Sequence, residues 1–365
     1  MHFPRFLLSL SAAIWLGAAT ASADITVRIS VKAVLNPATG NRQAGVSEMT
    51  FSNTVVGMND MLQSYGRGYQ LQWVGNALVN VGGLGQFLTG PSRYYDVDFV
   101  NDDNGDALKD QFEANAINNP GTYGWSASAV NIYIVRFGGA NWNVCSFPGS
   151  QIILINGAAG YSTARTVLHE IGHYFNLSHT FNGRQNLNAN NTACTNGCNC
   201  AKFVGGGDDK IDDTILDHDC WTDQNDIAQG NYSLNYANLS ATRQAAVDRI
   251  WNNLMSYHGR QHDTPFLTSD QLDRWTDSAN GDRPGVRTGR TWFVDRACSA
   301  LAATGNSDCA VIGGPFHTAA LGVAAAKSGG QDIVLLRPGN YNEPMTITKA
   351  LTMRATRGNA TIGKP

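Results

Sequence analysis

The chain has 365 residues and a formal net charge of −3, and charged residues make up only 15% of it. This length is enough for two domains. The slightly acidic balance argues against a nucleic-acid partner and against an anionic membrane surface, because both attract basic proteins.

The N-terminal residues 1–23 have the pattern of a secretory signal peptide. Arg5 precedes an apolar run over residues 6–19, and Ala21-Ser22-Ala23 is a small-residue cleavage site. The run is too short for a comfortable membrane span, so we expect it to be removed and not retained as an anchor. No later stretch is long and apolar enough to cross a bilayer. The sequence predicts an exported protein, extracellular or, in a Gram-negative source, periplasmic.

Predicted strands and helices then alternate as far as residue 176, which favours a mixed α/β lobe. Apolar alternation or continuous apolar runs predict strands, and amphipathic spacing predicts helices. The strands are expected over residues 25–31, 69–74, 130–135 and 152–155, and the helices over residues 47–65 and 106–116.

The central motif is HExxH, formed by His169, Glu170 and His173. Histidines four residues apart lie one above the other on a helix face, so both imidazoles can reach one zinc ion. Glu170 points to the same side of the ion and can take a proton from a water that the ion activates. The alternative is an amphipathic helix with two histidines on its polar edge.

A third histidine, His179, follows six residues after His173. It cannot share the face of a straight helix with His173, so it reaches the ion only if the helix ends and the chain turns back. Asn176 stands where this turn needs a residue that tolerates left-handed dihedrals. Three nitrogen ligands leave a fourth position for water, which is typical of catalytic zinc. The spacing HExxHxxNxxH differs by one residue from the metzincin pattern HExxHxxGxxH.

Met255 and Tyr257 lie downstream in the segment NNLMSY. Metzincins place a tight turn with a methionine beneath the zinc site, where the thioether forms a soft apolar floor. Alone, Met255 is ordinary core, but the helix motif favours a methionine turn. Tyr257 can reach the metal or the oxyanion that develops during hydrolysis.

Residues 169–181 read HEIGHYFNLSHTF and resemble the pappalysin, or cytophagalysin, family of metzincins. The resemblance implies an α+β or mixed α/β catalytic domain with a twisted sheet, an active-site helix and a lower lobe that carries the methionine turn. It implies a zinc-dependent endopeptidase acting on a protein or peptide substrate, which would bind in extended form along the edge strand near residues 138–149. The chain departs from the family pattern at Asn176, where glycine is usual, and at Ser256, where aspartate is common.

The polar loop over residues 182–236 is so long that it needs disulfides or bound ions to be ordered. Its stretch GDDKIDDT, residues 207–214, is similar to the family's GDxVxDT. Closely spaced carboxylates suit calcium, and a solvated acidic loop is the alternative. The candidate calcium ligands are Asp208, Asp209, Asp212 and Asp213, with Asp217 and Asp219 nearby. We expect His218, His258 and His262 at the surface or behind the ligands, not on the zinc.

Seven cysteines in an exported chain predict disulfides. The alternative for the central cluster is a structural zinc. The cluster comprises Cys194, Cys198, Cys200 and Cys220; Cys298 and Cys309 form a local pair, and Cys145 stands apart. The odd count leaves at least one thiol without a partner in the chain.

The predicted catalytic domain covers residues 24–276, a linker rich in Gly, Asp, Arg and Pro covers residues 277–291, and a different module covers residues 292–365. In this module a helix is expected over residues 315–328, and strands over residues 333–341 and 347–355. The pattern resembles the opening coil of a right-handed parallel β-helix. A solenoid needs about three repeats to stand alone, so the module is either docked on the protease or cut short.

The leading functional hypothesis is a secreted zinc endopeptidase with Glu170 as general base. A thermolysin-type enzyme would need a glutamate ligand on a later helix, and no suitable E-x-x-x-D pattern follows. The alternative from another class is a non-catalytic secreted protein that binds a surface or a glycan through its C-terminal module. The substrate and the oligomeric state do not follow from the sequence.

Overall fold

The structure is a computed structural model that describes most of the chain between residues 25 and 363. The described ranges are 25–74, 87–97, 107–137, 144–145, 148–158, 160–182, 208–218, 220–258, 265–298, 303–309, 314–328, 331–349, 351–356 and 358–363. The predicted signal peptide, the cysteines at positions 194, 198 and 200, Asp219 and His262 lie outside these ranges. Within them, no helix has both the length and the apolar character that a membrane span requires.

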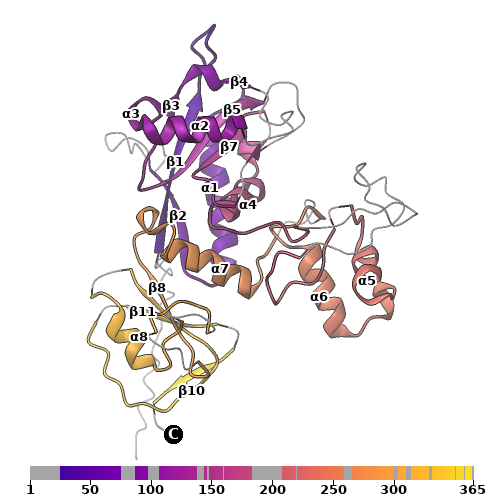
Figure 1. The fold of residues 1–365 in the computed structure, drawn as a ribbon, viewed down its shortest axis with the longest axis vertical. Helices are drawn as coiled ribbons and strands as arrows, with labels where there is room; N and C mark the ends of the chain where they lie inside the picture. Colours follow the sequence, from indigo (N-terminus) through magenta and orange to yellow (C-terminus); the bar gives the residue numbers. More distant parts are fainter. Residues whose placement is uncertain are drawn as a thin grey trace, which may run out of the picture.

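A seven-stranded sheet forms the upper part of the molecule, with the strand order β2-β1-β5-β7-β6 (Figure 1). The short strands β3 and β4 pair with β1 and β5. All pairings are parallel except that of β6 with β7, so the sheet ends in an antiparallel edge strand. The strands are β1 (Ile25–Val34), β2 (Tyr69–Trp73), β3 (Leu88–Gly90), β4 (Asp96–Val97), β5 (Val130–Phe137), β6 (Val144–Cys145) and β7 (Ile152–Asn156).

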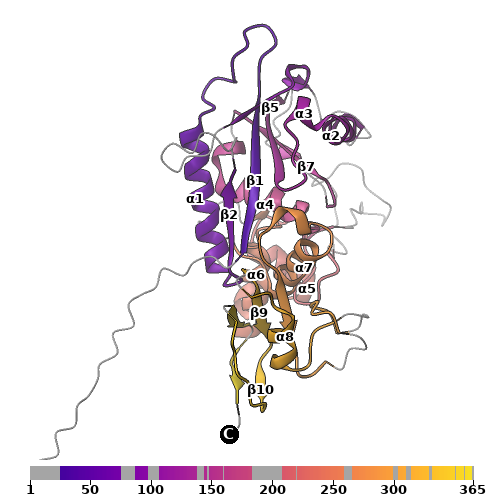
Figure 2. The same cartoon turned by 90° about the vertical axis from the view of Figure 1, so that its left-hand side faces the viewer.

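Helices cover both faces of this sheet, which explains why β5 and β7 are buried along almost their whole length. Figure 2 shows α1 on one side and α2 with α3 on the other. The helices are α1 (Glu48–Ser64), α2 (Ala107–Asn118), α3 (Pro120–Tyr123) and α4 (Ala164–Tyr174), with short 3-10 turns at Ser92–Tyr94 and Gly160–Ser162. The predicted strands and helices of this lobe are confirmed, and so is its mixed α/β class.

Lys32 is a fully buried lysine near the C-terminal end of β1. Its Nζ donates to Asn131 Oδ1 at 2.6 Å and to the Ser30 carbonyl at 3.1 Å, and it lies 5.0 Å from the centre of the Tyr133 ring. Burial lowers the pKa of Lys32 to about 7, because the surroundings solvate an ammonium group poorly.

Lys32→Met is therefore expected to stabilise the protein at acidic pH. The unfolded chain keeps an ordinary lysine pKa of about 10.4, so stability of the wild type rises with pH between about pH 7 and pH 10. Below that window the native wild type buries a charge that methionine lacks. The free energy of unfolding of Lys32→Met should therefore exceed that of the wild type by on the order of 3–5 kcal/mol. Urea unfolding at about pH 6 and about pH 9, at equal metal loading, measures this. The control is Lys327→Met at an exposed site. If the gain in free energy of unfolding of Lys32→Met over the wild type were as large at the higher pH as at the lower pH, the prediction would be wrong.

The lower lobe contains α5 (Gln224–Tyr232), a 3-10 turn (Tyr236–Asn238), α6 (Ala241–Trp251) and α7 (Ser269–Asn280). Helices α5 and α6 share a small core of their own, in which Trp221 packs directly against Gly230. Helix α7 begins with a capping box. The Thr268 side chain accepts a hydrogen bond from the Gln271 amide, and the Gln271 side chain accepts one from the Thr268 amide.

The C-terminal part has a parallel three-stranded sheet in the order β11-β9-β8 and a parallel pair, β10 with β12. Its elements are β8 (Thr291–Val294), α8 (Ala319–Ala325), β9 (Ile333–Leu336), β10 (Gly339–Tyr341), β11 (Thr352–Ala355) and β12 (Ala360–Ile362), after a 3-10 turn at Pro284–Val286. Phe293, Ile333 and Leu335 belong to the same core as the seven-stranded sheet. The module is thus docked on the upper lobe through α7. That it opens a β-helix stays a prediction.

A buried ion cluster reinforces this docking. Asp273 on α7 pairs with Arg67 at 2.8 Å through one oxygen and with Arg337 through the other. All three side chains are at most 10% exposed. Because α7 continues to Asn280, it occupies the beginning of the segment expected to be a linker. The division into two domains stays a prediction.

Candidate metal centre

Helix α4 carries the two histidines of the HExxH motif. His169 is 8% exposed and His173 is 2% exposed, and both face away from solvent. The helix is buried along most of its length, since residues 167–174 are all buried. The rigid helix therefore fixes two of the three predicted ligands.

The helix ends as expected, at Asn176. Asn176 has φ of 62°, and its amide donates to the His173 carbonyl while the Leu177 amide donates to the Gly172 carbonyl. This pair of bonds is a Schellman motif with asparagine in the left-handed position. The Asn176 side chain also donates to Asp282 at 2.6 Å and to Ser278 at 3.1 Å.

Substitution at Asn176 should separate these two contributions. Asn176→Ala keeps the left-handed strain and loses both side-chain bonds, so we expect it to destabilise the protein by about 1–2 kcal/mol. Asn176→Gly loses the same bonds but relieves the strain, so it should cost less. Urea unfolding of both variants measures the difference. If glycine were the more damaging replacement, the backbone explanation would be wrong.

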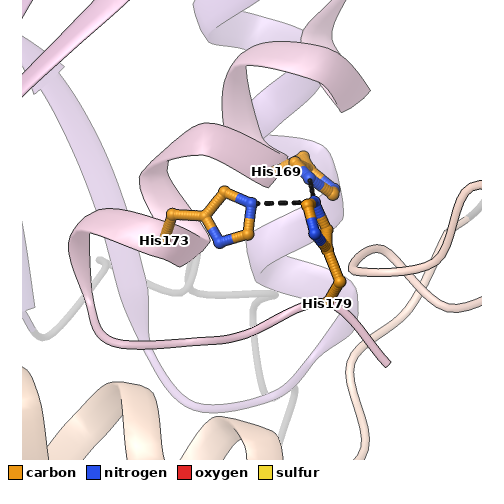
Figure 3. Close-up of side chains that lie close together, drawn as sticks. All are labelled: His169, His173 and His179. Atoms are coloured by element: carbon orange, nitrogen blue, oxygen red, sulfur yellow. Dashed lines mark hydrogen bonds between the residues drawn. The ribbon is translucent and has the colours of Figure 1, made fainter. Parts of the chain in front are cut away.

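The turn brings His179 back onto the two helical histidines (Figure 3). His179 Nε2 lies 3.1 Å from His169 Nε2 and 3.1 Å from His173 Nε2. The three form a group of ligand atoms within 4.8 Å of one another. The predicted convergence of residues 169, 173 and 179 is therefore present in the structure.

Backbone carbonyls fix the orientation of both helical imidazoles. His169 Nδ1 lies 2.7 Å from the Leu254 carbonyl, and His173 Nδ1 lies 2.6 Å from the Leu177 carbonyl. A carbonyl only accepts, so each Nδ1 carries the hydrogen and each Nε2 presents a lone pair. His179 could donate a hydrogen to only one of them, and a divalent cation at the centre would satisfy all three nitrogens. The residues present thus fit a zinc ion, which takes imidazole nitrogens at about 2.0–2.1 Å.

Burial controls the protonation of this centre. The pKa of His173 falls to about 4 because burial disfavours the imidazolium, partly offset by its bond to Leu177. Glu170 is 4% exposed, and its Oε1 lies 3.9 Å from His169 Nε2. Burial raises the pKa of Glu170 to about 8, against a smaller lowering effect of Lys109. A cation beside this carboxyl would lower its pKa, so a metal and a charged Glu170 favour each other.

Met255 lies under the centre, as the resemblance implied. It is fully buried, and a Cβ added at Gly172 would come within 2.7 Å of its Sδ. Helix α4 therefore needs glycine between the two ligands to admit the methionine. The Met255 amide donates to Asn253 Oδ1 at 2.8 Å, which closes the turn.

Tyr257 lies beside the ligand rings. Its ring centre is 4.8 Å from that of His179 and 6.1 Å from that of His169. Phe181 completes the cluster, since it stacks on His179 at 4.7 Å and meets the edge of Tyr257 at 4.7 Å. Phe181, the last residue of the motif, thus packs against the third predicted ligand.

The candidate calcium ligands do not converge. Among the described residues, the aspartates of this loop form no group of three ligand atoms within 4.8 Å. Asp208 pairs with Lys210 at 2.7 Å, and Asp213 accepts from the Asp270 amide. Asp209 is buried and accepts from Thr214 at 2.6 Å. Asp212 is exposed. Calcium stays a prediction without support from this geometry.

His218 and His258 do not belong to the group of converging histidines. Of the two places expected for them, at the surface or behind the ligands, the surface is excluded because both side chains are buried. His218 is 0% exposed and the His258 side chain is 2% exposed. Both contact Asp217, which is itself fully buried. The sequence groups Asp217 with the carboxylates that suit calcium, because spacing along a loop does not show which carboxylate turns inward.

The cysteine predictions are borne out where the structure describes them. Cys298 and Cys309 form the expected local disulfide, and Cys220 is also disulfide-bonded. The other members of the central cluster lie outside the described residues.

A parallel α/β sheet, three convergent imidazoles and a buried carboxylate beside them define the centre of a metalloprotease. The model of the peptidase family described as pregnancy-associated plasma protein-A matches residues 144–280. This range runs from β6 to the end of α7 and contains the three histidines, Glu170 and the methionine turn. The chain is a metalloendopeptidase, a hydrolase whose substrates are peptides.

Solved structures of mirolysin resemble the fold. Mature mirolysin of Tannerella forsythia, in complex with a cleaved peptide, is 14% identical with a TM-score of 0.42, covering 72% of this chain and 94% of that one. A promirolysin variant of Tannerella forsythia is 14% identical with a TM-score of 0.44, covering 73% of this chain and 84% of that one. A search of curated proteins found no match.

Proposed function

We propose that the protein is a secreted zinc endopeptidase in which His169, His173 and His179 hold the ion and Glu170 is the general base. One observation carries the proposal. Backbone carbonyls orient the imidazoles of His169 and His173, so that each presents the lone pair of its Nε2. Both Nε2 atoms lie 3.1 Å from His179 Nε2, and Glu170 lies beside them. This arrangement suits a metal site with three nitrogen ligands and an open position for water and substrate.

Zinc held there would lower the pKa of a water molecule and polarise the scissile carbonyl. Glu170 lies on the side of His169 Nε2, so its carboxylate can accept the proton of the attacking water and pass it to the leaving amine. Burial of Glu170 excludes competing water from that carboxylate. We propose that Tyr257, whose ring packs against His179, donates to the carbonyl oxygen as that oxygen gains charge.

The peptide substrate is proposed to lie along β6, the antiparallel edge strand. Strand β6 contacts α4, so an extended peptide paired with it would pass beside the histidines. The predicted signal peptide, residues 1–23, supports export. The proposed catalytic domain covers residues 24–276, and the module over residues 292–365 is proposed to begin like a parallel β-helix.

A non-catalytic surface- or glycan-binding protein is not favoured. A binding protein has no need of a buried carboxylate 3.9 Å from an inward-facing imidazole nitrogen, because burying that carboxylate is unfavourable. A structural zinc would be closed by a fourth protein ligand.

Hydrolysis of a quenched peptide mixture, with and without a chelator, tests this function. The mature chain is expected to contain one zinc per molecule, to cleave the mixture, and to lose activity on chelation. Activity should return when zinc is restored. Zinc-free protein that cleaves as fast as zinc-loaded protein would overturn the proposal, as would zinc-loaded protein that cleaves nothing in the mixture.

A further inference from the structure

The third histidine differs from the other two in how it is held. His169 and His173 are parts of α4, but His179 lies on a loop five residues after that helix ends. A ligand on a loop needs support from elsewhere, because no helical hydrogen bonds fix its backbone. The residue that follows it, Thr180, is 1% exposed, and its amide donates to the Met255 carbonyl at 3.3 Å.

The second support of Thr180 is a fully buried carboxylate. The Thr180 hydroxyl donates to Asp217 Oδ2. Asp217 is 0% exposed, and its other oxygen accepts from the His218 amide at 2.7 Å and from His258 Nε2 at 2.6 Å. One carboxylate therefore receives three donors in a buried environment, where each bond is strong and each loss is costly.

These donors come from three separate segments. Thr180 follows α4, His218 lies before α5, and His258 follows the methionine turn. The His258 ring stacks on Trp251 of α6 at 5.4 Å and 9°. The carboxylate is thus anchored to the lower lobe on one side and to the ligand loop on the other.

We propose that Asp217 is a positioning residue for the third metal ligand. Its carboxylate ties Thr180 to the His258 segment, and this holds His179 at the distance that the other two imidazoles require. The inference rests on the proposed zinc site. It assigns to Asp217 a role in holding the zinc ligand His179, in place of a role as a calcium ligand.

The test measures zinc affinity by competition with a chromophoric chelator, on the full mature chain. Asp217→Asn keeps the shape but replaces an acceptor oxygen with a donor, so zinc affinity should fall about 10–100-fold. Thr180→Val removes the hydroxyl alone and should lower affinity in the same direction. Asp110→Asn, at an exposed site on α2, is the matched control and should leave affinity unchanged.

A second background separates positioning from general destabilisation. In His179→Ala protein, which binds through the two helical histidines, adding Asp217→Asn should not change the remaining affinity, because Asp217 acts through His179. Equal losses in both backgrounds would overturn the proposal, and so would wild-type affinity in both Asp217→Asn and Thr180→Val. If Asp217→Asn does not fold, as judged by circular dichroism, Thr180→Val decides alone. Wild-type protein that binds no zinc would instead refute the proposed function.

Discussion

Glu170→Gln is expected to lower peptide hydrolysis by about 10²–10⁴-fold while the protein keeps its zinc, because a positioned general base contributes about that much. The amide has nearly the shape of the carboxylate, so the helix and the ligand geometry should persist. It cannot accept the proton of the attacking water. The measurement pairs kcat/KM on a quenched peptide with zinc content per molecule.

Glu48→Gln on α1 is the matched control, since Glu48 lies in the first turn of that helix and pairs with Arg42 at the surface. It should hydrolyse peptide at the wild-type rate. If Glu170→Gln kept full activity with full zinc content, another group would have to take the proton. If it lost zinc as well, Glu170 would be a ligand and not a base.

His179→Ala is expected to weaken zinc binding by more than about 10²-fold, beyond the usual effect of removing a residue that merely supports a ligand. Two imidazoles remain on α4, but the third nitrogen that closes the site is lost. Hydrolysis should fall with zinc occupancy. Thermal unfolding gives a second readout, because zinc raises the melting temperature only of protein that binds it tightly.

His317→Ala is the matched control, since His317 is exposed on the C-terminal module. It should keep wild-type zinc affinity and the wild-type rise in melting temperature. Undiminished zinc affinity in His179→Ala would show that the ion is held by a different ligand set.

The local features of the centre could be predicted from the sequence because each is fixed by short-range geometry. The spacing of His169 and His173 follows from the helical repeat, and Asn176 marks the turn because few residues tolerate left-handed backbone. Met255 required a pattern specific to one class of protease. The three histidines converge in the structure as the spacing predicts, and the roles of these residues stay proposals.

Helix ends were predicted less well, and the reasons are tertiary. An alanine-rich composition predicted a helix over residues 315–328, but α8 begins only at Ala319. Phe316 is held in a bridge to Val294, and Thr318 caps the helix by accepting from the Leu321 amide. Composition alone does not reveal a bridge to a strand more than twenty residues away.

Polar contacts between residues far apart in the sequence could not be predicted either, because they too depend on the tertiary structure. Nothing in the local pattern distinguishes Asp217, which binds Thr180 and His258, from the exposed Asp212 of the same loop. Asp273 likewise gave no sign that it would join two arginines from distant segments. Such residues become recognisable only when the fold brings their partners together.

Anomalous diffraction from crystals of the zinc-loaded mature protein, recorded on both sides of the zinc absorption edge, tests the central assignment most directly. A single zinc peak is expected within about 2.0–2.1 Å of the Nε2 atoms of His169, His173 and His179, with Glu170 outside the coordination sphere. A peak that excluded His179, or no zinc at this position in protein that cleaves peptides, would contradict the assignment.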